Sequence, residues 1–220
     1  MNYKKIIKSD ILETISKIAD ENNYEIFVVG GYVRDSILGK KAKKDIDILV
    51  LGNGIEFANL VALNLKIKIQ VFKNFGTAMI KTKGLQIEFV GARKESYSES
   101  SRNPKIKKGT LYDDLSRRDF TINALAIRLN GKEKGELIDN HNGLNDLSNN
   151  ILKTPKDPIK TFHDDPLRML RAIRFSSQLN FEIDKNDFEC IKEESERIKI
   201  ISKERINDEL NKILISPKPS

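Results

Sequence analysis

The sequence predicts an α/β protein, with strands and helices over residues 1–140 and helices alone over residues 141–220. Two observations predict this class. Short apolar runs of strand length alternate with helical patterns in the first part, and apolar residues recur at helical spacing throughout the second. A chain of 220 residues is long enough to bury one large core or two smaller ones.

The first part is expected to begin as helix, strand, helix, strand. Apolar residues at helical spacing predict an amphipathic helix over residues 5–21, and Glu25–Val29 is typical of a short buried strand. Two glycines, Gly30 and Gly31, then turn the chain into a helix over Tyr32–Leu38. The next strand is expected over Asp45–Leu51.

Further elements follow from the same patterns. We expect a helix from Ile55 to Leu65, and then strands at Ile67–Phe72, Thr77–Lys81 and Leu85–Val90, the last two joined as a hairpin by Lys83-Gly84. The polar composition of residues 94–109 predicts a long mobile loop. Beyond Asp139 we expect helices at Asp164–Leu179, Asp187–Ile198 and Ser202–Ile213, the last with Ser202 as its N-cap.

Composition limits the class of protein. Charged residues make up 32% of the chain and hydrophobic residues 39%, as in ordinary soluble domains, and the net charge of +7 favours a polyanionic partner. The single cysteine, Cys190, excludes an intrachain disulfide framework, and its place in an amphipathic helix favours a core residue over a nucleophile. Without an apolar signal segment or membrane-length run, we expect a cytoplasmic protein with no membrane partner and no disulfide-linked partner.

The turn at Gly30-Gly31 is a candidate phosphate cradle. A strand, two glycines and a helix present backbone N–H groups and a positive helix end to an anion, and Arg34 adds a planar donor for phosphate oxygens. The similar turn Gly52-Asn53-Gly54 is not a dinucleotide site, because Phe57 occupies the position of the third glycine.

Asp45 and Asp47 are candidate metal ligands. Alternation along a strand places both carboxylates on one face and Ile46 and Ile48 on the other, and two such acids repel each other unless a cation lies between them. Oxygen ligands beside a phosphate site suit Mg²⁺. Glu88, on the strand Leu85–Val90, is either a third acid of this site or an exposed strand residue, and the sequence leaves both open.

Two arginine-rich clusters complete the set of candidates. In Arg117–Ala124, the two arginines could bind triphosphate and the shorter polar residues Asp119, Thr121 and Asn123 could bind ribose hydroxyls, although spacing alone favours a capped, charged helix start. In the second cluster, Asp164–Phe175, three arginines step by three along one helical face, with Asp165 at its N-terminal end: Arg168, Arg171 and Arg174. No motif supports a side-chain nucleophile or a zinc site.

Taken together, these motifs resemble the family of CCA-adding tRNA nucleotidyltransferases and bacterial poly(A) polymerases. The resemblance rests on residues 30–47, 117–124, 139–147 and 164–175 and spans essentially the whole chain. It implies a nucleotidyltransferase head over residues 1–140, with a mixed β-sheet flanked by helices, followed by an all-helical neck over residues 141–220. Family members usually continue past the neck into body and tail domains. This chain stops at Ser220, just after the expected neck helices, so we expect the body and tail domains to be absent from it.

The resemblance also implies a role for each candidate residue. Asp45 and Asp47 would hold catalytic Mg²⁺, with Glu88 as a possible third acid. Gly30, Gly31, Arg34 and Arg118 would bind the incoming nucleotide, and Asp119 and Asn123 would support its ribose. Asp165 and Arg168 on the base-recognition helix would read the base, with Arg171 and Arg174 completing the pocket.

The implied activity is addition of CCA to the 3′ end of tRNA from CTP and ATP by a two-metal mechanism. The sequence Asn123-Ala124-Leu125 resembles the CCA-adding version of its motif more than the poly(A) version. The alternatives are poly(A) synthesis, addition of CC or A only, or a nucleotide- or RNA-binding module without turnover.

Overall fold

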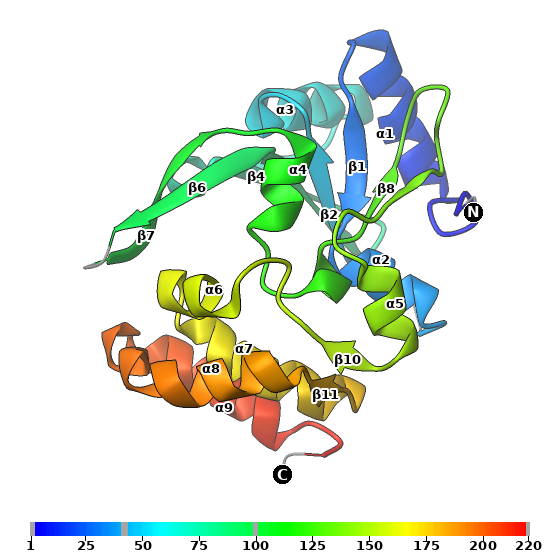
Figure 1. Cartoon of the computed structure of the whole chain (residues 1–220). Coiled ribbons are helices and arrows are strands. Elements are labelled where there is room, and N and C mark those ends of the chain that lie inside the picture. Colours follow the sequence, from blue (N-terminus) through cyan, green and yellow to red (C-terminus); the bar gives the residue numbers. More distant parts are fainter. Residues whose placement is uncertain (1–2, 41–43, 99–100, 219–220) are drawn as a thin grey trace. The chain divides into compact units, whose positions relative to one another are not determined.

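The computed structural model describes residues 3–40, 44–98 and 101–218, without the side chains of residue 74 and of residues 96–105. The chain divides into two compact units. Figure 1 shows the whole chain coloured by residue number, so each unit can be found from its residue ranges. The first unit comprises residues 1–94, 107–115 and 123–140. The second comprises residues 95–106, 116–122 and 141–220.

A mixed sheet of seven strands forms the centre of the first unit, in the order β3-β4-β5-β2-β1-β8-β9. The pair β2–β5 is parallel and the other pairs are antiparallel. The elements of this unit are α1 Asp10–Glu21, β1 Ile26–Val29, α2 Gly31–Ile37, β2 Asp45–Val50, α3 Gly54–Leu65, β3 Ile69–Phe72, β4 Thr77–Thr82, β5 Leu85–Gly91, β8 Ala126–Arg128 and β9 Leu137–Ile138. The structure therefore confirms the predicted α/β class and its mixed sheet.

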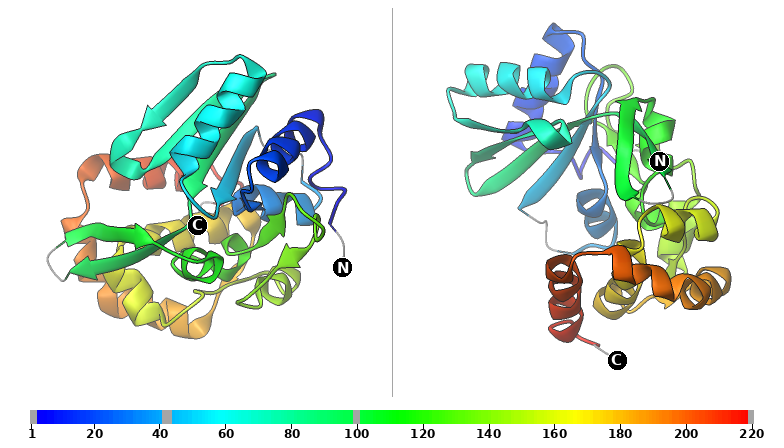
Figure 2. Two further views of the ribbon diagram at one scale, coloured as in Figure 1. Left: turned by 90° about the horizontal axis from the view of Figure 1, so that it is seen from above. Right: turned by 90° about the vertical axis from the view of Figure 1, so that its left-hand side faces the viewer.

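The helices of this unit cover the sheet. Helix α3 packs on β4 and β5, and α1 lies beside α3 (Figures 1 and 2). The glycine turn before α3 has a packing reason, because a Cβ on Gly54 would lie 2.6 Å from the backbone nitrogen of Gly91. Helix α1 begins five residues later than predicted, since the Ser9 hydroxyl accepts a hydrogen bond from the Leu12 N–H as its N-cap.

The hairpin predicted at Lys83-Gly84 is confirmed. Both residues have positive φ, 47° and 77°, as the tight turn of a two-residue hairpin requires. Strands β4 and β5 pair directly across it, with Thr82 opposite Leu85.

The loop predicted over residues 94–109 is wrong. Arg93–Ser98 and Ser101–Lys108 form the strands β6 and β7 of a separate two-stranded sheet, while residues 99 and 100 lie outside the described part. Its base is closed by Gly109, whose N–H donates to the Ala92 carbonyl at 3.0 Å, and a Cβ on Gly109 would lie 2.6 Å from the backbone of Arg93. The polar sequence was misleading because strand pairing satisfies the backbone whatever the side chains are.

The second unit is mainly helical but not all-helical as predicted. Its helices α5–α9 are accompanied by two short parallel strands, β10 and β11. Helix α4, Leu111–Ser116, belongs to the first unit except for its last residue. The bounds are α5 Gly143–Ser148, β10 Ile151–Leu152, α6 Pro158–Asp164, α7 Leu167–Leu179, β11 Glu182–Ile183, α8 Lys185–Glu194 and α9 Lys203–Leu214, with short 3-10 turns at Thr121–Asn123 and Ser195–Ile200.

The helix predicted from Asp164 to Leu179 is broken. Helix α6 ends at Asp164, Asp165 is extended with φ −141° and ψ 96°, and α7 starts after Pro166. The break is expected physically, because a residue that precedes proline is disfavoured in the helical region. It makes Asp165 part of a corner between two helices.

The remaining predictions for this unit concern α8, α9 and the cysteine. Helix α8 begins before the predicted Asp187, since Asp184 caps it. Ser202 occupies the N-cap position of α9 but, within the described residues, makes no side-chain capping bond. Cys190 is confirmed as a core residue, packed with Phe162 and Met169, and burial raises the pKa of its thiol to about 11. Among the described residues, no helix has the length and apolar character needed to cross a bilayer.

Candidate functional site

In the first unit, strand β2 presents its two aspartates on one face. Asp45 is exposed and Asp47 half-buried, while Ile46 and Ile48 are buried on the opposite face. The predicted alternation is confirmed. The parallel pairing of β2 with β5 then places Glu88 directly opposite Asp47. Paired residues in a parallel ladder point to the same face, so Glu88 joins the two aspartates there, and its side chain is half-buried.

This carboxylate group fits a hard divalent cation. Two acids on one strand with a third on its neighbour supply oxygen ligands only, which Mg²⁺ prefers. Among the described residues, no group of three or more His, Cys, Asp or Glu side chains forms a ready-made metal cage. Any cation held on this face would therefore take its other ligands from water or substrate oxygens.

The glycine turn lies next to these acids. Val29, the residue before Gly30-Gly31, pairs with Asp47 in the antiparallel ladder of β1 and β2. Gly30 requires a glycine, since its φ is +75°. Gly31 does not, because a Cβ there would meet only Arg34 Nη2 at 3.6 Å, an ordinary contact. Within the described residues, no side chain caps α2, so its first N–H groups have no side-chain acceptor.

Arg34 is held more tightly than its predicted role suggests. Its side chain is 3% exposed, its Nε donates to Asp35 Oδ1 at 2.8 Å, and its Nη1 donates to Asn123 Oδ1 at 2.6 Å. The structure therefore joins the first motif to Asn123 of the second through a buried guanidinium. Arg34 can therefore orient Asn123, and its Nη2 lies 2.7 Å from Asp35 Oδ1.

In the second unit, Asp119 and Arg171 form an ion pair. Arg171 Nε and Nη2 donate to Asp119 Oδ2 at 2.8 and 2.5 Å, and Asp119 raises the pKa of the guanidinium. The Arg171 guanidinium also lies 5.3 Å from the ring of Phe175, which itself packs edge-on against Phe120. This pair brings the Arg117–Ala124 motif and the Asp164–Phe175 motif together.

The other two arginines of the row have different partners. Arg174 Nε lies 2.6 Å from Glu209 Oε2 of α9, and its guanidinium stacks 4.1 Å from the Phe175 ring. Burial, followed by the neighbouring charge of Arg171, lowers the pKa of Arg174. Arg168 Nη2 donates to the Arg117 carbonyl at 2.8 Å, and its Nη1 donates to the Thr161 carbonyl at 3.3 Å.

The remaining candidate residues of the second unit are Arg118 and Asp165. Arg118 is half-buried, and its neighbour Arg117 forms an ion pair with Glu95 at 3.2 Å. Asp165 Oδ1 accepts a hydrogen bond from the Leu167 N–H at 3.3 Å, which fixes the corner between α6 and α7. Burial raises the pKa of Asp164, against the nearby charge of Arg168.

A groove of about 390 Å³ opens beside this corner. It is lined by residues of α7, its preceding corner and α9: Asp165, Leu167, Arg171, Arg205, Asp208, Glu209 and Lys212. Sequence reasoning identified Asp165 and Arg171 but missed the α9 residues. Their spacing along one helical face was the available signal, but only the packing of α9 on α7 shows that this face lines a groove.

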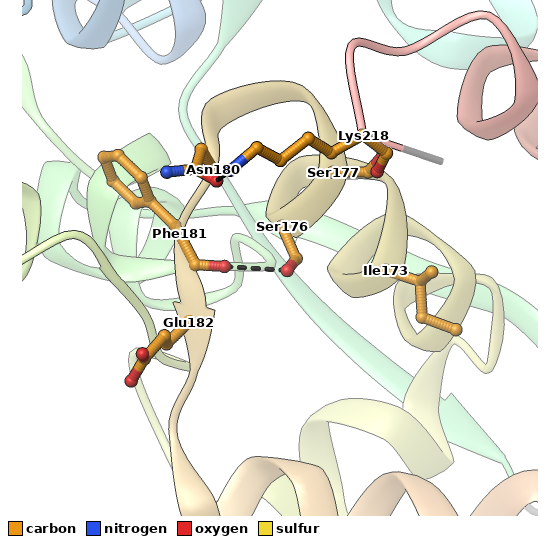
Figure 3. Close-up of a pocket in the computed structure, with 7 residues that line it drawn as sticks. All are labelled: Ile173, Ser176, Ser177, Asn180, Phe181, Glu182 and Lys218. Atoms are coloured by element: carbon orange, nitrogen blue, oxygen red, sulfur yellow. Dashed lines mark hydrogen bonds between the residues drawn. The ribbon is translucent and has the colours of Figure 1, made fainter. Parts of the chain in front are cut away.

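A second hollow, of about 270 Å³, lies at the other end of α7 (Figure 3). Its polar groups bond to one another: Ser176 Oγ donates to the Phe181 carbonyl at 2.7 Å, and Lys218 Nζ donates to Asn180 Oδ1 at 2.6 Å. The bond from Lys218 attaches the C-terminal segment to the end of α7, so we interpret this hollow as a packing feature.

Comparison with known families identifies both parts of the chain. The family described as "Poly A polymerase head domain" matches residues 26–153. A second, described as "Probable RNA and SrmB- binding site of polymerase A", matches residues 180–220.

Curated relatives carry related names. An A-adding tRNA nucleotidyltransferase of Aquifex aeolicus is 41% identical over 76% of this chain and 20% of its own length. A CCA-adding enzyme of Limosilactobacillus reuteri is 40% identical over 91% of this chain and 48% of its own. The chain thus spans at most about half the length of these relatives.

Solved structures agree in fold. The apo form II of a CCA-adding enzyme superposes with a TM-score of 0.89 at 37% identity, covering 100% of this chain and 53% of that one. A tRNA nucleotidyltransferase complexed with a primer tRNA and an incoming ATP analogue superposes with a TM-score of 0.80 at 35% identity, and the match covers 92% of this chain and 55% of that one.

Proposed function

The chain belongs to the poly(A) polymerase head domain family, which its motifs indicated, and from this premise we propose that it is an RNA nucleotidyltransferase that adds CCA to the 3′ end of tRNA from CTP and ATP. The named activities of its relatives support transfer of a nucleotide to tRNA. The chain covers only part of each relative, so the activity of this chain itself is the proposal.

One observation carries the proposal: the register that places Val29 opposite Asp47 and Asp47 opposite Glu88. It sets a glycine turn with uncapped N–H groups beside a face of carboxylates. The first suits the phosphates of a nucleotide and the second suits Mg²⁺. Asp45 and Asp47 would hold the metal, which when bound lowers the pKa of the attacking 3′-hydroxyl and neutralises the leaving pyrophosphate.

The chain's own residues would then bind and orient the substrates. Gly30 and Gly31 would admit the triphosphate close to the backbone, and Arg34 would hold Asn123 toward the ribose. Arg118 would contact phosphate, since a guanidinium is a planar donor suited to phosphate oxygens. Because the protein supplies mainly positioning and charge, no covalent intermediate is required.

In the second unit we propose that Asp165 and Arg168 read the base. Cytosine and adenine each offer an amino donor next to a ring-nitrogen acceptor, which matches a carboxylate that accepts and a guanidinium that donates. The two carbonyl bonds of Arg168 use two of its five N–H donors and fix its orientation. Arg171 would complete the pocket, and its ion pair with Asp119 would hold it in place.

Addition of A alone is the second candidate, because the Aquifex relative is named as an A-adding enzyme. Two tRNA substrates separate the candidates, one lacking CCA and one ending in CC, each incubated with Mg²⁺ and one labelled nucleotide at a time. CCA addition predicts labelling of the first by CTP and of the second by ATP. Labelling of only the second indicates an A-adding enzyme, and labelling of neither contradicts the proposed activity.

Two further expectations belong to this proposal. Residues 1–140 would be the head and residues 141–220 the neck of such an enzyme, and it would act in the cytoplasm, where its tRNA substrates are. Limited proteolysis near residue 140 and fractionation of cells that express the chain would test them.

A further inference from the structure

We infer that Arg205 and Asp208 of α9 are specificity residues that favour adenine over cytosine in the groove beside Asp165. The inference rests on the proposed function and adds two residues that the motifs do not include. Both side chains line the groove together with Asp165 and Arg171, and both are exposed to solvent.

The charges of the groove identify the kind of ligand. The groove is lined by three cationic side chains, Arg171, Arg205 and Lys212, and by three carboxylates, Asp165, Asp208 and Glu209. A phosphate would be repelled by the carboxylates, whereas a neutral heterocycle with donors and acceptors can satisfy both signs. A groove of about 390 Å³ lies within the range of small-molecule sites and accommodates a nucleoside.

Most of these charged groups already have partners. Arg171 is paired with Asp119, and Glu209 lies against Arg174 and, at 3.1 Å, Lys212. Arg205 and Asp208 differ, because within the described residues their side chains form no hydrogen bond or ion pair. A ligand could therefore engage Arg205 and Asp208 without breaking a contact of the described residues.

The chemistry of the pair selects among bases. Arg205 and Asp208 stand three residues apart on α9 and so share a face, one able only to donate and the other only to accept. Adenine offers two edges with an amino donor next to a ring-nitrogen acceptor, since its amino group lies between N1 and N7. Cytosine offers one such edge. If Asp165 and Arg168 take one edge, only adenine leaves a second for Arg205 and Asp208.

The test compares two double variants with equal changes of charge. Arg205→Gln/Asp208→Asn removes the pair, while Lys203→Gln/Glu204→Gln makes the same charge changes at exposed positions of α9 that do not line the groove. ATP and CTP binding is measured by calorimetry without RNA, and transfer to tRNA ending in CC or lacking CCA is measured separately. Equal melting temperatures of the two variants establish that both are folded.

We expect the ratio of the ATP to the CTP dissociation constant to rise about fivefold in the groove variant and to stay unchanged in the control, since an exposed polar pair contributes modestly. An unchanged ratio, or equal losses for both nucleotides, overturns the inference even if the protein transfers nucleotides normally. A selective loss of ATP binding in a protein that transfers nothing leaves the inference standing and contradicts the proposed function instead.

Discussion

The carboxylates of β2 and the arginines of α7 are both rows of like charge, yet the fold uses them differently. Asp45 and Asp47 share one face of a strand, and the register with β5 adds Glu88 to it. The three arginines also share a face by spacing, but each has a different partner: a backbone carbonyl for Arg168, Asp119 for Arg171 and Glu209 for Arg174. Alternation on the strand therefore gathers the acids on one face, whereas regular spacing on the helix does not give the three arginines a common partner.

The largest expected effect is at β2. Asp45→Ala or Asp47→Ala should reduce transfer about 1,000-fold or more, because each removes a proposed metal ligand. The unfolding free energy should change by less than about 1 kcal/mol, since the core lies on the opposite face. Single-turnover transfer assays and urea unfolding measure the two effects.

The matched control for this prediction is Gln86→Ala. It removes the 3.1 Å hydrogen bond from Gln86 Nε2 to Asp45 Oδ1 but keeps both carboxylates, so most activity should remain. An aspartate variant that retains more than about a tenth of the wild-type rate would end the metal-site interpretation.

For the arginines of α7, we expect loss of an ion-pair partner to lower the unfolding free energy. Asp119→Ala removes the oxygen that accepts two hydrogen bonds from the Arg171 guanidinium and should lower the unfolding free energy by about 2 kcal/mol. The exposed pair of Glu25 with Arg128 is the control, and Glu25→Ala should lower it by less than about 1 kcal/mol. Similar losses in urea unfolding would show that Arg171 is not fixed by Asp119.

At the glycine turn, we expect a substitution at Gly31 to affect nucleotide binding and a substitution at Gly30 to affect stability. Gly31→Ala has room for its Cβ and should leave the unfolding free energy within about 0.5 kcal/mol, while ATP binding weakens about tenfold if phosphate approaches the backbone there. Gly30→Ala should instead lower the unfolding free energy by about 1–2 kcal/mol, because its φ is +75°. Unimpaired ATP binding by Gly31→Ala, measured by calorimetry, would contradict the cradle.

A further expected effect concerns pH in the second unit. Asp187 is 2% exposed and accepts hydrogen bonds from the Thr154 N–H and hydroxyl at 2.7 and 3.2 Å, and burial raises its pKa to about 6. The folded state thus holds this proton more tightly than the unfolded state. The contribution of Asp187 to the unfolding free energy should therefore fall as the pH rises from about 4 to about 6 and stay low above that.

Asp187→Asn removes this titration while keeping an acceptor for the Thr154 N–H. Relative to wild type, the variant should gain about 2 kcal/mol in unfolding free energy between pH 4.5 and pH 8. Asp184→Asn, at the N-cap of the same helix, should leave the pH dependence in place. Identical pH profiles for wild type and Asp187→Asn, from thermal melts, would show that the carboxyl titrates normally.

Several features of the fold and candidate site could be predicted from local sequence. The hairpin at Lys83-Gly84, the strand of Asp45 and Asp47, and the glycine turn depend on backbone preferences within a few residues. The ribbon of β6 and β7 could not be predicted, since its polar residues carry no strand pattern and its stability comes from pairing. Helix α1 starts later than predicted because Ser9 caps it through its side chain.

By itself, the sequence determined the family through its motifs, and it determined that Asp45 and Asp47 share a face and that the chain turns at Gly30, because strand alternation and glycine conformation are set locally. Only the tertiary structure decided what the charged residues touch. Arg34 meets Asn123 across 89 positions and Arg171 meets Asp119 across 52, and the groove exists because α9 packs on α7. Charges can pair with any opposite charge that packing brings within reach, so their partners follow from the folded chain and not from their spacing.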